Sequence, residues 1–211
     1  MDEIKVSVIV PAYNTEGYIE RMITCLLKQT YTNLQLIFID DGSTDKTAKI
    51  IKSFKDPRIE YYYQKNSGVS AARNLGLNKV TGDKIFFFDS DDTFGPCLIK
   101  DCIEYVKAND VESVLYGYGN KINGELTDEH VFKIDGIYRN DRILNELLPA
   151  FLGHSFDDVN QWLRGEKGQR EGKEHTALWR IMLDASVVKE NQIYFDTSLW
   201  LGEDTKFINT Y

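Results

Sequence analysis

Short apolar runs alternate with amphipathic stretches along the first 118 residues of this chain. The apolar runs are bounded by residues that form turns, a pattern typical of strands that alternate with helices. The runs predict strands over Val6–Val10, Leu34–Ile39, Ile59–Tyr63, Lys84–Phe88 and Ser113–Tyr118. The stretches between them predict helices over about Glu16–Gln29, from Ser43 or Thr44 to about Lys55, over Val69–Lys79 and from Pro96 to about Ala108.

This alternation predicts an α/β fold with an open, mostly parallel sheet and helices on its faces. The first run, Val6-Ser7-Val8-Ile9-Val10, is β-branched and nearly all apolar, as expected of a strand that is covered on both sides. In such sheets ligands bind at the carboxyl ends of the strands. Functional side chains are therefore expected where the apolar runs end.

Beyond residue 120 the alternation is lost. Asn123-Gly124 lies between two polar–apolar runs and favours a β-hairpin. No repeat or linker separates domains, so we expect one domain with a smaller, irregular C-terminal region. The pattern there predicts a helix over Arg139–Phe151, a long polar loop over Gly153–Glu174, a largely helical segment over Leu178–Glu190, a short strand over Ile193–Phe195 and a last helix that begins at Gly202-Glu203-Asp204.

Composition narrows the classes of partner. The chain of 211 residues has a net charge of −8, which argues against nucleic acid as a partner because phosphate contacts need a basic surface. Its three cysteines lack CxxC spacing and indicate neither a disulfide framework nor a zinc site. We see neither a signal peptide nor a run of the ~18 apolar residues that a spanning helix needs. We therefore expect a cytoplasmic chain with no transmembrane segment, for which peripheral association with a membrane stays open.

Three of the predicted strands end in polar side chains. The first ends in Pro11-Ala12-Tyr13-Asn14, the second in Asp40-Asp41 and the fourth in Asp89-Ser90-Asp91-Asp92. Alternation along a strand would put Asp89 and Asp91 on one face, where two carboxylates repel unless a cation lies between them. Hard oxygen ligands suit Mg²⁺ or Mn²⁺. The alternative is a solvated acidic strand end in which Asp92 or Thr93 caps the next helix.

These strand ends are part of a wider resemblance. In order along the chain, five segments resemble the motifs of family 2 of the nucleotide-sugar glycosyltransferases, which have the Rossmann-like GT-A fold. Each motif alone is weak, but five in the same order are specific to that superfamily. The segments are Val6–Asn14, Ile39–Thr47, Asn66–Leu77, Phe88–Asp92 and Gly202–Phe207.

The resemblance implies roles for individual residues. Asp41 would accept a hydrogen bond from the nucleotide base, and Arg73 would approach the nucleotide or the carboxylates beside it. Asp89 and Asp91 resemble the DxD pair, with Asp89 near the ribose and Asp91 at a metal bound to the diphosphate. Asp204, in Gly-Glu-Asp, resembles the catalytic base. The remaining nucleotide-binding residues implied are Pro11, Ala12, Tyr13, Asn14 and Ser90.

The activity so implied is transfer of a sugar, with inversion, from a UDP-sugar to an acceptor hydroxyl, with Mn²⁺ or Mg²⁺ as cofactor. The acceptor would be a saccharide or lipid-linked saccharide, in cell-surface or capsular polysaccharide synthesis. The alternative is a metal-dependent nucleotide-binding module or a nucleotidyltransferase on a similar sheet. Those proteins usually carry a Gly-rich or basic phosphate loop near the N-terminus, and Pro11–Gly17 has neither several glycines nor a lysine.

The resemblance also divides the expected domain. Residues 1–118 would form its nucleotide-binding half and residues 119–211 its acceptor-side half. Only seven residues follow Asp204, where relatives usually continue into further helices, so part of the acceptor side is expected to be missing.

Overall fold

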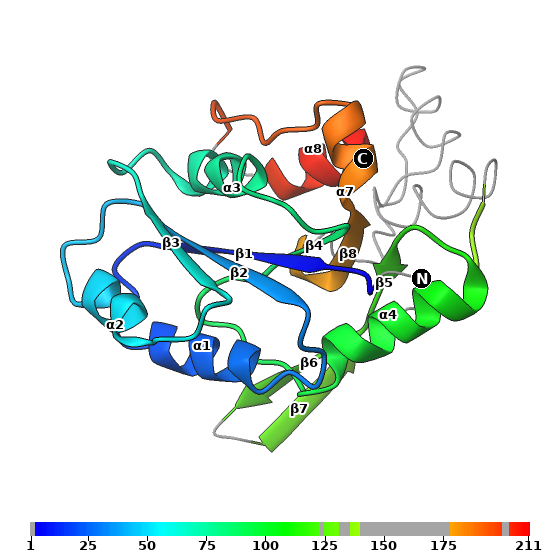
Figure 1. The fold of residues 1–211 in the computed structure, drawn as a ribbon, viewed down its shortest axis with the longest axis horizontal. Coiled ribbons are helices and arrows are strands. Elements are labelled where there is room, and N and C mark those ends of the chain that lie inside the picture. The colour runs from blue at the N-terminus through cyan, green and yellow to red at the C-terminus, as the bar shows by residue number, and fades with distance from the viewer. Residues whose placement is uncertain (1–2, 123–124, 131–135, 140–177, 200–202) are drawn as a thin grey trace, which may run out of the picture. The chain divides into compact units, whose positions relative to one another are not determined.

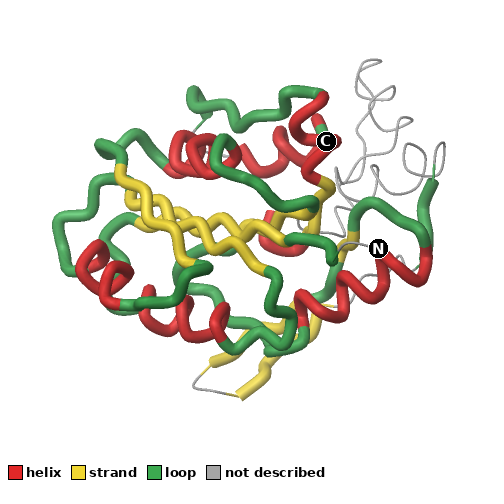
Figure 2. The backbone as a smooth tube through the Cα atoms, viewed as in Figure 1, coloured by secondary structure: helices red, strands yellow, loops and turns green. Residues whose placement is uncertain are grey.

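The computed structural model describes residues 3–122, 125–130, 136–139, 178–199 and 203–211. The chain divides into two compact units. The larger unit comprises Met1–Leu115 and Ile181–Tyr211, and the smaller comprises Tyr116–Arg180. Figure 1 shows the described elements as a ribbon, and Figure 2 shows the same chain coloured by secondary structure.

The larger unit is built on one six-stranded sheet with the strand order β3-β2-β1-β4-β8-β5. The first four strands in this order run parallel to one another, and β8 runs antiparallel to both β4 and β5. The expected open, mostly parallel sheet is therefore confirmed, with a mixed edge. Its strands are β1 (Val6–Ala12), β2 (Leu34–Asp40), β3 (Ile59–Tyr63), β4 (Lys84–Phe87), β5 (Val114–Leu115) and β8 (Ile181–Asp184).

Helices cover both faces of this sheet. In Figure 1, α3, α7 and α8 lie over one face, and α1, α2 and α4 lie over the other. The approach of α3 to the sheet is close, because a Cβ added at Gly76 would lie 2.5 Å from Cγ2 of Ile9 in β1. The helices are α1 (Ile19–Leu27), α2 (Thr47–Ser53), α3 (Val69–Leu77), α4 (Leu98–Asn109), α7 (Ala185–Glu190) and α8 (Glu203–Thr210).

Three predicted helix starts lie too early. The first helix begins at Ile19 and not at about Glu16. The helix after β2 begins at Thr47, and neither Ser43 nor Thr44 caps it, because both side chains bond to Asn14. The helix after β4 begins at Leu98 without a side-chain cap, so the capping role considered for Asp92 or Thr93 is also wrong.

The largest difference between the predicted and the observed elements lies in Leu178–Glu190, for which the sequence predicts a largely helical segment. It comprises a 3₁₀ turn, η2 (Leu178–Arg180), the strand β8 and the helix α7. Ile181–Asp184 forms a strand because it pairs with the buried β4, a tertiary effect that overrides local helix preference.

The strand expected over Ile193–Phe195 is likewise wrong, because this segment pairs with no strand among the described residues. The backbone of Phe195 instead bonds to the side-chain amide of Asn74 in α3. Its Oδ1 accepts from the backbone N–H of Phe195 at 2.8 Å, and its Nδ2 donates to the backbone carbonyl of Phe195 at 2.9 Å.

The smaller unit contains the expected hairpin, formed by β6 (Tyr118–Ile122) and β7 (Glu125–His130). The strand expected over Ser113–Tyr118 is split between β5 and the start of β6. The expected helix over Arg139–Phe151 and the expected loop over Gly153–Glu174 lie outside the described residues. Within the described parts of the chain, no helix is both long enough and apolar enough to cross a bilayer.

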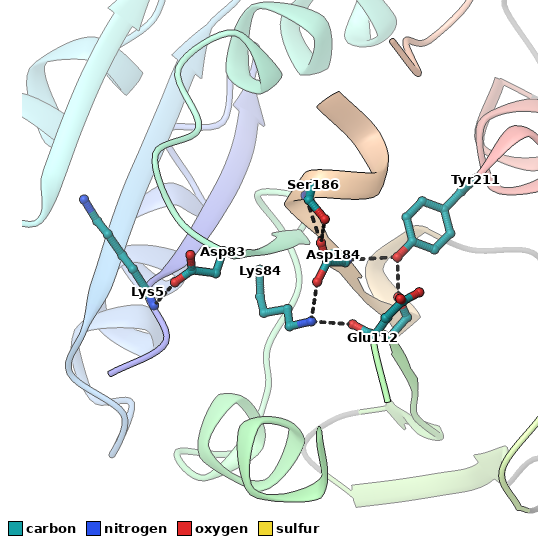
Figure 3. Close-up of polar contacts among 8 residues, drawn as sticks. Lys5, Asp83, Lys84, Glu112, Asp184, Ser186 and Tyr211 are labelled. Carbon is teal, nitrogen blue, oxygen red and sulfur yellow. Dashed lines mark hydrogen bonds and ion pairs between the residues drawn. The ribbon is translucent and has the colours of Figure 1, made fainter. Parts of the chain in front are cut away.

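A buried ion pair joins β8 to β4 (Figure 3). The ammonium of Lys84 donates to Asp184 at 2.6 Å and to the backbone carbonyl of Glu112 at 2.7 Å. The hydroxyl of Tyr211, next to the end of α8, accepts from the backbone N–H of Asp184 at 2.9 Å. These contacts fix the register of the antiparallel edge and attach the C-terminal end of α8 to it.

Candidate active site

The polar strand ends that the sequence singled out come together at one edge of the sheet. β1 lies between β2 and β4, and Ala12 is in register with Asp40. The pairing continues past the strands, since the backbone N–H of Asp41 donates to Ala12 at 2.9 Å and that of Phe88 donates to Ile9 at 3.1 Å. Pro11 and Ala12 are the last two residues of β1 and are buried between the ends of β2 and β4.

The loops after β1 and β2 are joined by reciprocal hydrogen bonds. Asn14, with φ of 51°, donates its backbone N–H to the hydroxyl of Ser43 at 3.0 Å. Its side-chain oxygen accepts from the backbone N–H of Thr44 at 2.8 Å. Tyr13, beside it, is 49% exposed. Asn14 thus holds the two loops together, and the ring of Tyr13 is left accessible at this edge.

Both acidic residues at the end of β2 are buried and have internal partners. Asp40 accepts from the backbone N–H of Ser43 at 2.8 Å and from the hydroxyl of Tyr61 at 2.7 Å. Asp41 accepts three hydrogen bonds, which come from the side-chain amide of Gln64 at 2.7 Å and the backbone N–H groups of Ser67 at 2.8 Å and Gly68 at 2.9 Å. Asp41 therefore fixes the loop that leads into α3. That its carboxylate also contacts a nucleotide base stays a prediction.

The acidic segment after β4 is a turn and not a strand, because β4 ends at Phe87. The backbone N–H of Asp92 donates to the carbonyl of Asp89 at 3.1 Å, and the carboxylate of Asp92 accepts from the N–H of Asp89 at 3.0 Å. The inference from strand alternation that Asp89 and Asp91 share a face therefore does not apply. Burial, together with the nearby charge of Asp89, raises the pKa of Asp92 to about 6.

Within this turn the side chains differ in exposure. Ser90 is buried, Asp89 is partly exposed and Asp91 is exposed. The backbone carbonyl of Asp91 accepts from the guanidinium of Arg21 in α1 at 2.7 Å, whereas the Asp91 carboxylate has no hydrogen bond or ion pair to any described residue. Asp91 thus presents an unpartnered carboxylate beside Asp89.

These two carboxylates fit a hard divalent cation. Among the described residues there is no group of three or more acidic, His or Cys side chains that could hold a metal by themselves. Mg²⁺ is usually bound through one or two carboxylates together with the phosphates of a substrate. Asp89 and Asp91 match that donor set, which depends on a diphosphate to complete it.

Arg73 in α3 connects the acidic turn to α8. Its Nη2 donates to Asp89 Oδ1 at 3.1 Å, its Nη1 donates to Asp204 Oδ1 at 2.6 Å, and Nη1 lies 3.5 Å from Glu203 Oε1. Only 5% of the Arg73 side chain is exposed. Three carboxylates from two separate elements therefore share one buried guanidinium.

The position of α8, which carries Asp204, is set by an aromatic cluster. Phe207 stacks on Phe195 with ring centroids 4.1 Å apart, and both rings make T-shaped contacts with Phe87 in β4. Phe207 is 1% exposed, so the helix is held against the sheet by buried apolar contact. Asp204, in the first turn of α8, consequently faces Arg73.

The structure thus brings Arg73, Asp89 and Asp204 together and adds two residues, Glu203 and Arg21, that the sequence analysis did not single out. Glu203 is signalled only by its place beside Asp204. Arg21 has no sequence signal, because its partner Asp91 lies 70 residues further along the chain. The roles assigned to the individual site residues stay predictions.

Sequence comparison matches this chain to one protein family. The family model described as "Glycosyl transferase family 2" matches residues 7–161. Glycosyltransferase GlyA of Streptococcus pneumoniae is 43% identical over 107 residues, which are 48% of this chain and 15% of that protein. The uncharacterized glycosyltransferase EpsJ of Bacillus subtilis is 26% identical over 204 residues, which are 96% of this chain and 54% of that protein. The chain thus spans about half or less of the length of these relatives.

Solved structures show the same fold. TarS of S. aureus superposes with a TM-score of 0.73 at 24% identity, over 98% of this chain and 33% of that one. The mannosyltransferase PcManGT of Pyrobaculum calidifontis, in complex with GDP-Man and Mn²⁺, superposes with a TM-score of 0.60 at 16% identity, over 98% of this chain and 52% of that one. At these identities the likeness establishes the fold alone, and the open α/β sheet described above is of the GT-A type.

Proposed function

Because this chain belongs to glycosyl transferase family 2, we propose that it transfers a sugar, with inversion, from a nucleoside-diphosphate sugar to an acceptor hydroxyl. The observation that carries this proposal is the joining of two acidic groups by Arg73 at the carboxyl edge of the sheet. One group, Asp89 and Asp91, suits a metal and a diphosphate, and the other, Asp204, suits proton transfer. Sugar transfer from a diphosphate needs both kinds of group close together.

Asp91 and Asp89 would hold a divalent cation, Mn²⁺ or Mg²⁺, on the diphosphate. When bound there, the cation would neutralise the charge that develops on the departing diphosphate. The unpartnered Asp91 carboxylate supports this assignment, since an exposed hard ligand without an internal partner is available to a cation.

Asp204 would act as the general base. A hydroxyl is a poor nucleophile, so the Asp204 carboxylate would remove its proton as the oxygen attacks the anomeric carbon, and the bond to the diphosphate would break on the opposite face of the sugar. Asp204 comes from α8 and the metal carboxylates come from the turn after β4, which is compatible with that opposed geometry. The ion pair with Arg73 uses Oδ1 of Asp204.

The nucleotide would lie along the ends of β1 and β2, and we propose UDP. Pro11, Ala12, Tyr13 and Asn14 would contact it from β1 and Ser90 from the acidic turn, with Asp41 and Arg73 close by. TarS has been solved in complex with UDP-GlcNAc, which supports a uridine donor for a chain of the same fold. The accessible ring of Tyr13 is suited to stacking on a base.

The acceptor would be a saccharide or a lipid-linked saccharide in the synthesis of a cell-surface polysaccharide. This part of the proposal rests on the family alone. The described residues at the carboxyl edge of the sheet would bind the donor, Asp204 would contact the acceptor hydroxyl, and the acceptor specificity would come from other residues.

A screen of nucleotide sugars with Mn²⁺ tests the proposal. Transfer or slow hydrolysis of at least one UDP-sugar is expected, together with tighter binding of UDP than of UTP in calorimetry. Tighter binding of the triphosphate without release of sugar would instead favour a nucleotidyltransferase and overturn the proposal.

A further inference from the structure

Arg73 is the buried cation of the candidate active site and contacts carboxylates from two elements that are far apart in sequence. Asp89 follows β4, whereas Glu203 and Asp204 open α8, 130 and 131 residues beyond Arg73. The carboxylates of Asp89, Glu203 and Asp204 meet the single guanidinium of Arg73, so the group formed by these four side chains has a net negative charge. A contact of this kind links the two acidic groups electrostatically.

The geometry of the contact depends on the guanidinium fork. Nη2 points to Asp89 and Nη1 points to Asp204, while Nε is buried and has no hydrogen-bond partner among the described residues. The guanidinium carbon lies 5.3 Å from the centroid of the Phe195 ring, which supports its plane. A lysine ammonium is a single point charge and cannot span both carboxylates in this way.

We propose that Arg73 is a positioning residue that holds the Asp204 carboxylate at a fixed place relative to Asp89 and competes with a cation for Asp89. Binding of a metal at Asp89 and the placement of Asp204 are then coupled through one side chain. The inference rests on the proposed function for the roles of Asp89 and Asp204. It assigns Arg73 the placement of carboxylates as its role, in place of simple contact with the nucleotide.

A direct consequence concerns Mn²⁺ in the absence of nucleotide. In the wild-type chain Arg73 occupies Oδ1 of Asp89 and offsets part of the negative charge of the group. Removing this cation leaves Asp89, Glu203 and Asp204 without their shared partner. Arg73→Met should therefore bind Mn²⁺ alone at least about threefold more tightly than the wild type.

Arg21 provides a matched control. It carries the same charge and lies at the same turn, but its guanidinium bonds to the backbone carbonyl of Asp91 and to no carboxylate of the group. Arg21→Met should change Mn²⁺ affinity by less than about twofold. An equal gain in Mn²⁺ affinity in both variants would attribute the effect to net charge and overturn the proposal. Mn²⁺ binding by Arg73→Met that is unchanged or weaker than in the wild type would overturn it as well. So would the absence of Mn²⁺ binding by both Arg73→Met and the wild type.

Arg73→Lys is a second variant, which retains the positive charge and is more easily accommodated in the fold. Its readout is the kinetics of sugar transfer. Loss of the fork should lower kcat for sugar transfer at least about tenfold, while KM for the nucleotide sugar stays within about threefold. A residue that only binds nucleotide would instead raise KM at unchanged kcat, and wild-type kcat in Arg73→Lys would equally overturn the proposal.

The two experiments separate this inference from the proposed function. If the wild-type chain transfers no sugar from any nucleotide sugar, the proposed function fails. The comparison of Mn²⁺ affinities in Arg73→Met and Arg21→Met still decides whether Arg73 competes for Asp89.

Discussion

At the scale of single residues, the Asp41 carboxylate holds a loop in place. Asp41 follows a buried strand and lies at the carboxyl edge of the sheet, where its backbone N–H donates to Ala12 at 2.9 Å. Its three donors come from residues 23 to 27 positions further along the chain, and no local pattern encodes such pairings. The carboxylate thus has a structural role that its neighbours in sequence do not reveal.

Replacement of Asp41 should therefore destabilise the protein even without ligand. Hydrogen bonds to a charged group contribute about 1.5–3 kcal/mol each and add incompletely, so Asp41→Ala should lower Tm by about 5–10 °C. Asp91→Ala is the control, since that carboxylate is exposed and has no partner among the described residues. Equal Tm values for the two variants in a thermal melt would contradict the structural role of Asp41.

Replacement of Asp204 should separate chemistry from binding. If Asp204 is the base, Asp204→Asn should lower kcat at least about a hundredfold, within the ~10²–10⁴ range typical of general bases. Its affinity for UDP with saturating Mn²⁺ should stay within about threefold, because the residue acts on the acceptor. Steady-state kinetics on the full-length protein and UDP titration check both expectations. A folded variant with more than a tenth of wild-type kcat would remove Asp204 from catalysis.

At the scale of elements, the strands with continuous apolar runs were predicted to within two residues, and the elements defined by distant partners were not. α8 was expected at Gly202-Glu203-Asp204 and begins at Glu203, because acidic residues favour the first turn of a helix. β8 was missed because Ile181-Met182-Leu183 is equally suited to a buried helix. The choice of strand depends on β4, whose Lys84 lies 100 residues before Asp184.

The ion pair between Lys84 and Asp184 should stabilise that pairing asymmetrically. Lys84 is only 6% exposed, so Asp184→Asn leaves a buried ammonium without its counter-charge, at a cost of about 3–5 kcal/mol. Lys84→Met leaves the more exposed Asp184, which still accepts from the backbone N–H of Ser186 at 2.8 Å, and should cost less. Denaturant unfolding of both variants at pH 7 measures the difference. A larger loss in Lys84→Met would contradict this account.

The same pair makes stability depend on pH. Burial alone would raise the pKa of Asp184, but hydrogen bonds from Lys84 and Ser186 outweigh it and hold the pKa below its ordinary value. The stabilisation is therefore complete above about pH 5, since an unfolded Asp titrates near 3.9, and is lost as the pH falls through the lower folded pKa. The difference in Tm between wild type and Asp184→Asn should shrink below about pH 4. A difference that stays constant down to pH 2 would rule out this ion pair as its source.

At the scale of the whole molecule, the alternating pattern was sufficient to predict the parallel half of the sheet. Each βα unit is local, and parallel strands bring their carboxyl ends to one edge, so the candidate site followed from the same pattern. The antiparallel edge could not be predicted, since it pairs segments that lie before and after the smaller unit. The division of residues 1–118 and 119–211 into donor and acceptor halves stays a prediction.

Ligand binding should stabilise the whole chain if the proposed site is correct. UDP at about a hundred times its Kd, with Mn²⁺, should add about 2.7 kcal/mol and raise Tm by roughly 5–10 °C. The rise should disappear in EDTA and be strongly reduced in Asp91→Asn, because the diphosphate contacts the protein partly through the cation. An equal rise in EDTA would show that UDP binds without metal.

The antiparallel pairing of β8 with β4 also has a consequence for synthesis on the ribosome. β4 is complete about 100 residues before Asp184 is added, and at 5–20 residues per second this interval lasts roughly 5–20 s. During that time one edge of β4 has unpaired backbone groups, and Phe87 lacks the rings of Phe195 and Phe207 that later cover it. Open edges of this kind promote pairing between chains. The nascent protein should therefore depend on chaperones most strongly in this interval, and the late arrival of β8 and α8 should complete folding and the candidate active site together.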